Sequence, residues 1–515
     1  MRKVLLLVVC FAALTGASAA RELDFLSFEE LNALAKPIEP ESERTMERLN
    51  RLLTIPRVVS TNSRIESTGD IIRIAFWNIG WSLQWPMIEA ALRDPDEFKS
   101  RIARHGGFSA SRWQKAADEL SLLRTADVIL LNEVDVGMPR TAYADVVREL
   151  ANALGMNYTF AVEFVELSDL GDDVDPLSYR GLHGNAILSR FPIRSVSVHR
   201  LPQCYDWFEA ERMQITNLEK GKRWTAARFL NERITRQVRR GGRMALIAEL
   251  NIGLGADQTL TAVASHLEDR STPSCRQQQL LDLLEGIQGI AGPVVFGADL
   301  NSSGRDGTPT SFEREITRRL TSEQFWGRCA VEWFVPPFSW MLHTMNLWKN
   351  SRDPTAVSIP ILARNRERPL FEMLRKFRFF DGSAFEFGQE ATLDTTNARG
   401  RKGFRPTRRF DRNLLGFMGA YKLDWIFVKP GYDRAGNADM QPENPRTLTT
   451  INRLPPVALS DHSPITVDLR RSRADTHQTS TVDSGLQGQP SLGLNSTPRV
   501  QQVVEQLFVP VIESH

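Results

Sequence analysis

The sequence predicts an α/β domain in which strands alternate with helices across residues 71–470. The first observation is a strand pattern, because Ile71–Trp77 and Val128–Leu131 are short runs rich in β-branched, aliphatic and aromatic residues. The second is a helix pattern between them, where apolar residues from Trp113 to Leu123 recur at helical spacing. Alternation of these two periodicities is typical of layered α/β domains, so this is the fold class that we expect.

The remaining elements continue this alternation to the end of the domain. Further strands are expected at Tyr158–Val165, Ala186–Leu188, Met244–Ile252, Thr259–Ala264, Pro293–Phe296, Leu423–Val428 and Ile465–Leu469. Helices are expected at about 41–53, 141–154 and 276–288. A long segment lies between Asn301 and Asp424, and we predict a large insertion there, at about 310–420.

The N-terminus has the pattern of a secretory signal peptide over residues 1–20. Arg2 and Lys3 are followed by the apolar run Val4–Ala13 and by small residues before the expected cleavage site. This run is about half of the roughly 20 residues that a membrane span needs, so we expect cleavage rather than anchoring. No other stretch is long and apolar enough to span a bilayer. The pattern predicts a secreted or periplasmic protein.

Two further segments differ from the predicted domain in composition. Residues 21–70 are polar and charged, and we expect a helical and linker extension there. Residues 471–515 are rich in Ser, Gln, Thr and Gly, which is typical of a low-complexity, mostly disordered tail. The sequence predicts no particular oligomeric state.

The cysteines also bear on the compartment. Removal of the signal peptide leaves Cys204, Cys275 and Cys329, which cannot all pair within one chain. Export permits one disulfide, and Cys204–Cys275 is the more natural pair, although the spacing does not fix the connectivity.

The charge of the whole chain does not indicate a partner. The formal net charge is only +2, which gives no global basic excess of the kind that favours nucleic acid. The predicted insertion is different, since residues 310–420 carry 19 Lys and Arg against 12 Asp and Glu. Selectivity for a partner must therefore come from local patches.

Polar residues interrupt the apolar strands near their ends. These residues are Asn78, Glu133, His266, Asp299, Asn301, Asp424, Asp461 and His462. Each of them alone is more often a turn, a cap or a satisfied histidine than a functional group. Several such positions in one chain, each beside an apolar strand, indicate a functional site, because ligands of α/β domains bind where strands end and loops begin. We therefore expect these residues to form one active site.

The order of these motifs resembles a known superfamily. The motifs are Trp77-Asn78, Asn132-Glu133-Val134, Ser265-His266-Leu267, Gly297-Ala298-Asp299-Leu300-Asn301, Leu423-Asp424-Trp425-Ile426 and Leu459-Ser460-Asp461-His462-Ser463-Pro464. Together they resemble the endonuclease/exonuclease/phosphatase superfamily, the deoxyribonuclease-I-like metal-dependent phosphoesterases, and Gly184–Pro192 matches a common strand of that family. The resemblance implies a four-layer α/β sandwich with two packed mixed sheets and a metal-dependent hydrolase of phosphoester bonds.

The resemblance also implies a role for each matching position. Glu133, with Asn78 and Asp461, would hold Mg²⁺ or Mn²⁺ through oxygen ligands. The other roles concern the reaction: Asp299 orients or deprotonates the attacking water, Asn301 holds the phosphate, Asp424 orients a histidine or assists the leaving group, and His266 and His462 donate hydrogen bonds to phosphoryl oxygens.

Three more residues are candidates for substrate or phosphate binding. Glu163 lies where some relatives carry an acid that pairs with the histidine at the position of His266. His183 and Asn185 precede a predicted strand and would line the cleft. The alternatives are an exposed strand residue for Glu163 and turn residues beside Gly184 for the other two.

A nuclease is the substrate hypothesis that the sequence favours. One arginine stretch comprises Arg228, Arg233, Arg236, Arg239, Arg240 and Arg243, and a second runs from Arg399 to Arg412. Arginines with interspersed aromatic residues suit phosphate tracking and base stacking. Arginine-rich surface segments are also common without any such role.

Two other hypotheses remain. In the first, a lipid head-group or small organophosphate is the substrate, and the apolar segment Trp333–Leu342 enters a lipid surface, unless it is the core of the insertion. In the second, the fold is a non-catalytic binding protein, which the intact set of candidate ligands disfavours.

Overall fold

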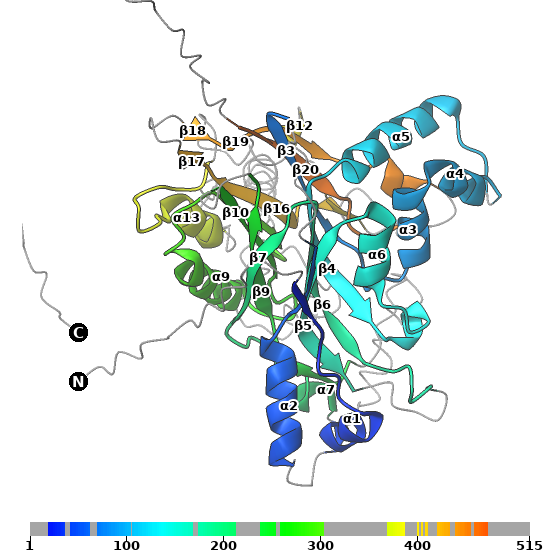
Figure 1. Cartoon of the computed structure of the whole chain (residues 1–515), viewed down its shortest axis with the longest axis vertical. Helices are drawn as coiled ribbons and strands as arrows, with labels where there is room; N and C mark the ends of the chain where they lie inside the picture. The colour runs from blue at the N-terminus through cyan, green and yellow to red at the C-terminus, as the bar shows by residue number, and fades with distance from the viewer. Residues whose placement is uncertain are drawn as a thin grey trace, which may run out of the picture. The chain divides into compact units, whose positions relative to one another are not determined.

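Two β-sheets form the middle of the structure, and helices cover their outer faces (Figure 1). The computed structural model describes residues 19–36, 42–61, 69–104, 106–167, 174–212, 237–253, 258–302, 368–386, 399–400, 403–404, 407–409, 420–432, 438–454 and 458–471. All of these belong to the compact unit Met1–Ser472.

The larger sheet, sheet A, is nine-stranded. Its order is β1 (Ala19–Arg21), β2 (Arg57–Ser60), β5 (Asn157–Glu166), β6 (Leu182–Ser189), β4 (Val128–Val136), β3 (Ile71–Asn78), β20 (Ile465–Arg470) and β19 (Gln441–Thr447), and β8 (Arg239–Gly241) pairs with β5. Strands β3 and β4 are parallel, whereas the other neighbours in this sheet are antiparallel.

Sheet B has five strands. Its order is β16 (Asp424–Lys429), β11 (Val294–Asp299), β10 (Thr259–His266), β9 (Met244–Asn251) and β7 (Ile193–Arg200). Strands β10 and β11 are parallel and the other pairs are antiparallel. Three short two-stranded ladders lie outside the sheets: β12 (Arg399–Gly400) with β13 (Gly403–Phe404), β14 (Arg408–Arg409) with β15 (Ala420–Tyr421), and β17 (Gly431–Tyr432) with β18 (Ala438–Asp439).

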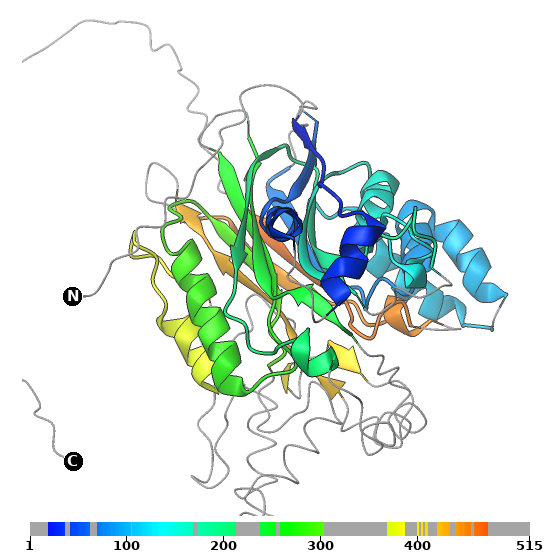
Figure 2. The ribbon, with the colours of Figure 1, turned by 90° about the horizontal axis from the view of Figure 1, so that it is seen from below.

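The helices form the two outer layers. They are α1 (Phe28–Ala35), α2 (Glu43–Thr54), α3 (Trp85–Arg93), α4 (Pro95–Ala103), α5 (Ala110–Arg124), α6 (Val146–Leu154), α7 (Glu209–Arg212), α9 (Pro273–Ile287) and α13 (Arg368–Lys376), with the 3₁₀ turns η1 (Pro139–Thr141) and η3 (Ile451–Arg453). Figure 2 shows α9 and α13 side by side on sheet B.

Local sequence signals explain where such a helix begins and ends. Helix α6 begins after Asp145, whose carboxylate accepts a hydrogen bond from the backbone N–H of Arg148. The helix ends at Gly155, which has a left-handed φ of 63° that glycine adopts without steric cost. Its apolar stripe, which includes Val147 and Leu150, is buried against the outer face of sheet A.

Three apolar layers separate the four layers of secondary structure. The first lies between sheet A and helices such as α3, α5 and α6, and includes Trp77 and Leu131. The second lies between the two sheets and includes Phe76 and Leu246. The third packs Phe296 and other residues of sheet B against α9 and α13. The expected four-layer α/β sandwich is therefore confirmed.

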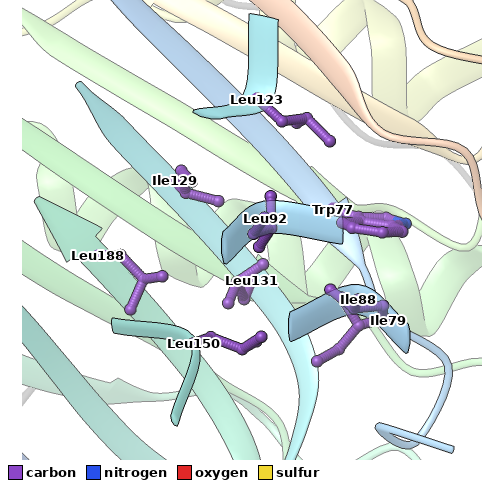
Figure 3. A pocket seen from close by; sticks show the side chains of 9 residues that line it. All are labelled: Trp77, Ile79, Ile88, Leu92, Leu123, Ile129, Leu131, Leu150 and Leu188. Atoms are coloured by element: carbon purple, nitrogen blue, oxygen red, sulfur yellow. The ribbon is translucent and has the colours of Figure 1, made fainter. Parts of the chain in front are cut away.

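One small apolar cavity lies in the first layer, close to the strand that ends at Asn78. Its lining residues are Trp77, Ile79, Ile88, Leu92, Leu123, Ile129, Leu131, Leu150 and Leu188 (Figure 3). Its accessible volume is about 10 Å³, and all nine side chains are apolar, so it offers no polar partner to a water molecule. We regard it as a packing gap of the core.

The two sheets are in close contact at Gly297 in β11. A Cβ atom at this position would lie 2.6 Å from Leu130 Cδ1 and 2.8 Å from Phe76 Cδ2 of sheet A. Glycine is thus favoured here because side chains of sheet A pack directly against the backbone of β11. Since Asp299 is two residues further along β11, this contact sets the spacing of the sheets beneath the polar strand ends.

The N-terminal segment adds strands and a helix to those predicted, and two of the cysteines form a disulfide. Strand β2 joins the edge of sheet A, so the sheet begins before residue 71, and α1 precedes the expected helix of α2. Strand β1 spans the expected cleavage region, whereas residues 1–18 lie outside the described residues. Cys204 and Cys275 form a disulfide with a Cα–Cα distance of 5.9 Å. Cys329 lies outside the described part.

Much of the predicted insertion also lies outside the described residues, including Trp333–Leu342. Within the insertion, residues 368–386 belong to the outer layer of sheet B, because Phe371 of α13 and Phe379 are buried in the third apolar layer. The tail predicted from residue 471 lies outside the description except for Arg471. In the described part of the chain, no helix has the length and apolarity that crossing a membrane requires.

Candidate active site

The predicted site residues meet at one edge of the two sheets. In sheet B, His266 at the end of β10 is paired in register with Asp299 at the end of β11, which in turn is paired with Asp424 at the start of β16. In sheet A, Asn78 ends β3 beside Asn132 of β4. The carboxyl ends of two parallel strand pairs therefore deliver these side chains to the same place.

Asn78 connects the two halves of this edge. Its Nδ2 donates to Glu133 Oε1 at 3.0 Å and to Asp299 Oδ2 at 3.1 Å, so one amide touches a carboxylate from each sheet. The other oxygen of Glu133 accepts a hydrogen bond from the backbone N–H of Trp81 at 2.9 Å. These bonds fix the direction of the Glu133 carboxylate.

Glu133 is placed by an irregularity of its strand. The pairing of β4 with β6 shifts between Leu131 and Val134, and Glu133 has a positive φ of 59°. A bulge of this kind re-aims a side chain, and a left-handed φ is costly for a residue with a Cβ atom. Asn301, with a φ of 46°, shares this feature. Strained backbone at two of the predicted residues fits a functional role.

Asp461 reaches the same turn from the C-terminal part of the chain. Ser460 Oγ donates to the backbone carbonyl of Asn78 at 2.7 Å, which anchors the segment. At Gly80, where φ is 56°, a Cβ atom would lie 3.1 Å from Asp461 Oδ1. The absence of a side chain there lets Asp461, which is exposed, lie close to the Asn78 turn.

His462 and Asp424 form a buried pair across the sheets. Nδ1 of His462 donates to Asp424 Oδ2 at 2.8 Å, and Nε2 lies 3.7 Å from Asp299 Oδ2. Burial disfavours the charged ring, but Asp424, Asp461 and Asp299 outweigh it and raise the pKa of His462 to about 10. His462 is therefore an imidazolium at neutral pH, with its Nε2–H directed to the centre of the site.

Asp299 is the central acid of the site. Only 1% of it is exposed, and burial together with the nearby charge of Asp424 raises the pKa of its carboxyl to about 6. Its Oδ1 accepts a hydrogen bond from the backbone N–H of Asn301 at 2.9 Å. A carboxylate with a raised pKa that is held in place by hydrogen bonds suits a general base near neutral pH.

His266 and Asn301 lie on the other side of Asp299. Nε2 of His266 is 3.6 Å from Asp299 Oδ2 and 2.9 Å from the amide nitrogen of Asn301, which donates to the carbonyl of Leu267. Burial and the charge of Arg243 hold the pKa of His266 well below its usual value, so this ring is neutral. The two histidines of the site therefore differ in charge.

Two groups of residues can hold a divalent cation. Asn78, Glu133 and Asp461 supply only oxygen donors, as Mg²⁺ and Mn²⁺ prefer, and the donor set fits such an ion. Asp299, Asp424 and His462 are also close enough to hold a metal, because their ligand atoms lie within 4.8 Å of one another. Asn78, Glu133 and Asp461 stay the predicted ligands of the ion, because an all-oxygen set is the one that Mg²⁺ and Mn²⁺ prefer.

The three candidate substrate-binding residues are buried behind this cluster. Asn185 Nδ2 donates to Glu163 Oε1 at 3.1 Å, and Asn132 Nδ2 donates to Asn185 Oδ1 at 2.8 Å. His183 is only 1% exposed, and its Nδ1 lies 2.8 Å from Asp135 Oδ1. Their described partners are thus protein groups, and a direct contact with substrate stays a prediction.

Glu163 differs from the expectation that it pairs with His266. Arg243 lies between them, with Nη1 at 3.1 Å from Glu163 Oε2 and at 2.8 Å from His266 Nδ1. The direct pair is therefore wrong, because the acid reaches the histidine only through a guanidinium.

The prediction that the arginine stretch before β9 tracks phosphates is wrong for two of its residues. Arg239 and Arg243 were expected to track phosphates, but their side chains are almost fully buried in ion pairs with Glu166 and Glu163. Arg240 Cζ lies 3.4 Å from the ring centroid of Phe208. Of this stretch, Arg228, Arg233 and Arg236 lie outside the described residues. In the second stretch, from Arg399 to Arg412, the structure describes no arginine side chain.

Several contributing residues were not predicted from the sequence. Asn132 was seen only as a spacer in its motif, yet its Oδ1 accepts the backbone N–H of Asp299 at 3.3 Å. Ser460 was part of a motif without a role. Arg243 was grouped with neighbouring arginines. The signal that could have separated it is its position directly before the apolar strand Met244–Asn251, which starts beside the motif strands.

The chain is similar to a family of known sequences and to several solved structures. The model of the Endonuclease/Exonuclease/phosphatase family matches residues 75–462, and a comparison with curated proteins found no match. Similar solved structures include an endonuclease/exonuclease/phosphatase from Beutenbergia cavernae (14% identity, 78% of this chain, 72% of that chain, TM-score 0.32). A second is the human Nocturnin catalytic domain (14% identity, 79% of this chain, 97% of that chain, TM-score 0.33). A third is a 3′-5′ exonuclease from Neisseria meningitidis (12% identity, 77% of this chain, 99% of that chain, TM-score 0.37).

These structural likenesses are too distant to decide a substrate. The family match is different, since it spans most of the chain and its limits enclose the site residues Asn78 to His462. The chain belongs to the endonuclease/exonuclease/phosphatase family, and it is a metal-dependent hydrolase of phosphoester bonds.

Proposed function

We propose that this protein is an exported, Mg²⁺- or Mn²⁺-dependent phosphodiesterase that cleaves nucleic acid by in-line attack of water. The observation that carries the proposal is the meeting of Asp299 with two histidines of different charge beside a set of oxygen ligands. Oxyanion stabilisation, a base and a cation site are the parts that hydrolysis of a phosphodiester requires.

The chain's own residues divide the work in this proposal. Asp299, within hydrogen-bond reach of Asn78 and flanked by both histidines, orients the attacking water and accepts its proton. The imidazolium of His462, held by Asp424, donates from Nε2 to an oxygen of the phosphate. The Asn301 amide beside His266 would donate to a second oxygen. Each donor stabilises charge that grows in the transition state.

The cation would be held by Asn78, Glu133 and Asp461. When bound, a divalent ion neutralises the phosphate and stabilises the developing negative charge. Without such neutralisation, the carboxylates of Glu133, Asp299 and Asp461 would repel an anionic substrate. The positive charge of His462 supplies part of this compensation from the chain itself.

A nucleic acid is favoured over a lipid by features near the metal ligands. Trp81 is partly exposed, its backbone N–H is bonded to Glu133, and the guanidinium carbon of Arg140 lies 5.2 Å from its ring centroid. An aromatic ring beside a phosphate-binding centre suits base stacking. The positive excess of residues 310–420 points the same way. Binding to a lipid surface would depend on Trp333–Leu342, which lies outside the described residues.

Export is part of the proposal and has two supports. The first is the signal-peptide pattern of residues 1–20. The second is the disulfide between Cys204 and Cys275, because disulfides persist mainly in oxidising compartments. Expression of the full chain with recovery of processed protein from the periplasm or medium would test it. Retention of residues 1–18 on a protein that stays in the cytoplasm would contradict it.

The substrate is tested with a panel on the purified protein. Plasmid DNA, single-stranded DNA, RNA, sphingomyelin vesicles and bis(p-nitrophenyl) phosphate would each be incubated with Mg²⁺, with Mn²⁺ and with EDTA. The expected result is EDTA-sensitive cleavage of nucleic acid, with the Asp299→Asn variant as the inactive control. Cleavage of sphingomyelin without cleavage of nucleic acid would instead support the lipid hypothesis. Metal binding without turnover of any of these would contradict a catalytic role.

A further inference from the structure

Arg243 is a buried cation in direct contact with a residue of the proposed active site. Only 4% of its side chain is exposed. Its Nη1 lies 2.8 Å from Nδ1 of His266, and the proposed reaction gives it no contact with substrate or metal. Burial of a guanidinium is costly unless it is paired, so the structure must compensate for this charge.

Three carboxylates provide this compensation. Glu163 lies 3.1 Å from Nη1, Asp269 lies 3.3 Å from Nη2 and Glu268 lies 3.7 Å from Nε of Arg243. Glu268 is itself held by Trp207, whose Nε1 donates to it at 2.8 Å. With acids around all three nitrogens, the guanidinium has a fixed plane and a fixed direction toward His266.

The chemistry of a guanidinium determines which ring nitrogen of His266 carries the proton. Arginine has only N–H donors, so the Nδ1 that faces it must offer a lone pair. Nε2 lies 2.9 Å from the amide nitrogen of Asn301, which is also a donor, so either tautomer of a neutral ring leaves one donor–donor contact. The charged guanidinium is the stronger donor, and Asn301 has the carbonyl of Leu267 as its acceptor, so the proton lies on Nε2, on the side of Asn301 and Asp299. An oxygen of the substrate beside Nε2 would accept this hydrogen. The other tautomer would place an Nδ1–H against the guanidinium, which the three acids hold in place.

The same network reaches Asp299 by a second route. Glu163 Oε1 accepts from Asn185, Asn185 accepts from Asn132, and Asn132 accepts from the backbone N–H of Asp299. One buried carboxylate, Glu163, thus joins the guanidinium that holds His266 to the amides that hold Asp299. The network explains why Glu163 and Asn185 are buried polar residues with several partners.

We propose that Arg243 is a positioning residue that holds His266 in the Nε2–H tautomer, with that hydrogen directed at the phosphate, and that Glu163 holds Arg243 in turn. The inference rests on the proposed function for its effect on turnover. The tautomer itself is a property of the protein without substrate, so the two can be tested separately.

The first test measures the tautomer. The full chain would be labelled with ¹⁵N-histidine, and the His266 ring signals assigned by their loss in His266→Gln. The expected wild-type pattern is a protonated Nε2 and an unprotonated Nδ1, and Arg243→Met is expected to give a mixture of both tautomers. Wild-type His266 protonated on Nδ1, or an unchanged pattern in Arg243→Met, would overturn the proposal.

The second test measures turnover of bis(p-nitrophenyl) phosphate with Mn²⁺. Loss of a residue that orients a catalytic group typically lowers activity by about 10- to 100-fold, and we expect this fall in kcat with KM nearly unchanged for Arg243→Met. Arg243→Lys, another donor-only cation, should recover part of it. In a His266→Ala background, Arg243→Met should have no further effect on kcat.

A matched control separates positioning from general stability. Arg57 in β2 is similarly buried, with 3% of its side chain exposed, and its Nη2 lies 2.7 Å from Asp145 Oδ2. Arg57→Met should destabilise the fold while leaving kcat and the His266 signals unchanged. An equal fall in kcat for both variants, or a full effect of Arg243→Met without His266, would refute a positioning role. If Arg243→Met does not fold, Arg243→Lys and Glu163→Gln are measured in the same way.

Discussion

The two halves of the active site differ in their exposure to solvent. On the side of sheet A, Glu133 is partly exposed and Asp461 is exposed, and both offer oxygen atoms. The other half comprises His266, Asp299 and Asp424 of sheet B together with His462, which are at most 3% exposed and are held by hydrogen bonds. The first half suits an ion that exchanges with solvent, and the second suits proton transfer in a place with little water.

The difference also appears in the charges. The strong pKa shifts of the site residues concern His266, Asp299 and His462, which are buried. Asn78 joins the halves, because its amide donates to Glu133 and to Asp299. The buried half therefore tunes protonation, while the open half supplies ligands. Variants that affect one half alone can test this division.

The largest effect is expected from Asp299→Asn. The amide keeps the shape of the side chain but cannot accept a proton from water, so kcat should fall by about 10²- to 10⁴-fold. Metal affinity, measured by Mn²⁺ titration, should change little. Asp282→Asn serves as the control, because Asp282 lies in α9 and pairs with His199, away from the site. Nearly full activity of Asp299→Asn would show that another group is the base.

Glu133→Gln should act on the open half instead. Removing one negative ligand weakens the cation site, and activity at limiting Mg²⁺ should fall by roughly 100-fold or more, with partial recovery at high metal concentration. Glu249→Gln is the matched control, since Glu249 lies on β9 with Arg194 as its partner. If the metal titration of Glu133→Gln coincides with that of the wild type, the cation is held elsewhere, and Asp299, Asp424 and His462 become the candidates.

The pH dependence of kcat/KM should reflect the buried half. Asp299 must be ionised to act as a base, so activity should rise as the pH increases through about 6. His462 must keep its proton to donate, so activity should decline as the pH increases through about 10. Asp424→Asn removes the group that contributes most to the raised pKa of His462, and should move the alkaline decline to lower pH. An unmoved alkaline limb would mean that another group titrates there.

The central strands and their polar ends could be predicted because burial on both faces leaves a continuous apolar run. Strands β3, β4 and β11 are of this kind, and the site residues stand out where the run stops. The edge strands were missed for the opposite reason. Strand β7 is partly exposed along most of its length, and β19 contains Pro442 and Pro445, so neither has a clear pattern.

The connections within the site were less predictable. Arg243 belongs to a run of arginines that resembles a solvated basic surface, and its partner Glu163 is 80 residues earlier in the sequence. The pairing of β5 with β8 brings the two segments together. The predicted direct pairing of Glu163 with His266 failed for this reason. Side-chain type at a strand end indicates a site, whereas the identity of its partners depends on tertiary packing.

The smallest effect, on stability rather than chemistry, tests whether the two halves need a fixed spacing. Gly297→Ala would place a Cβ atom within 2.8 Å of Leu130 and Phe76, which forces the sheets apart beneath Asp299. Overpacking of this kind costs about 1–3 kcal/mol of unfolding free energy, measurable by denaturant titration. Gly292→Ala is the control, since its nearest neighbour, Thr259 Oγ1, would be 3.9 Å away. If the spacing matters, Gly297→Ala should also lower kcat under conditions where it is fully folded, because Asn78 and Asp299 separate. A folded Gly297→Ala with wild-type kcat would show that the halves tolerate displacement, and that hydrogen bonding through Asn78 rather than the packing at Gly297 keeps them together.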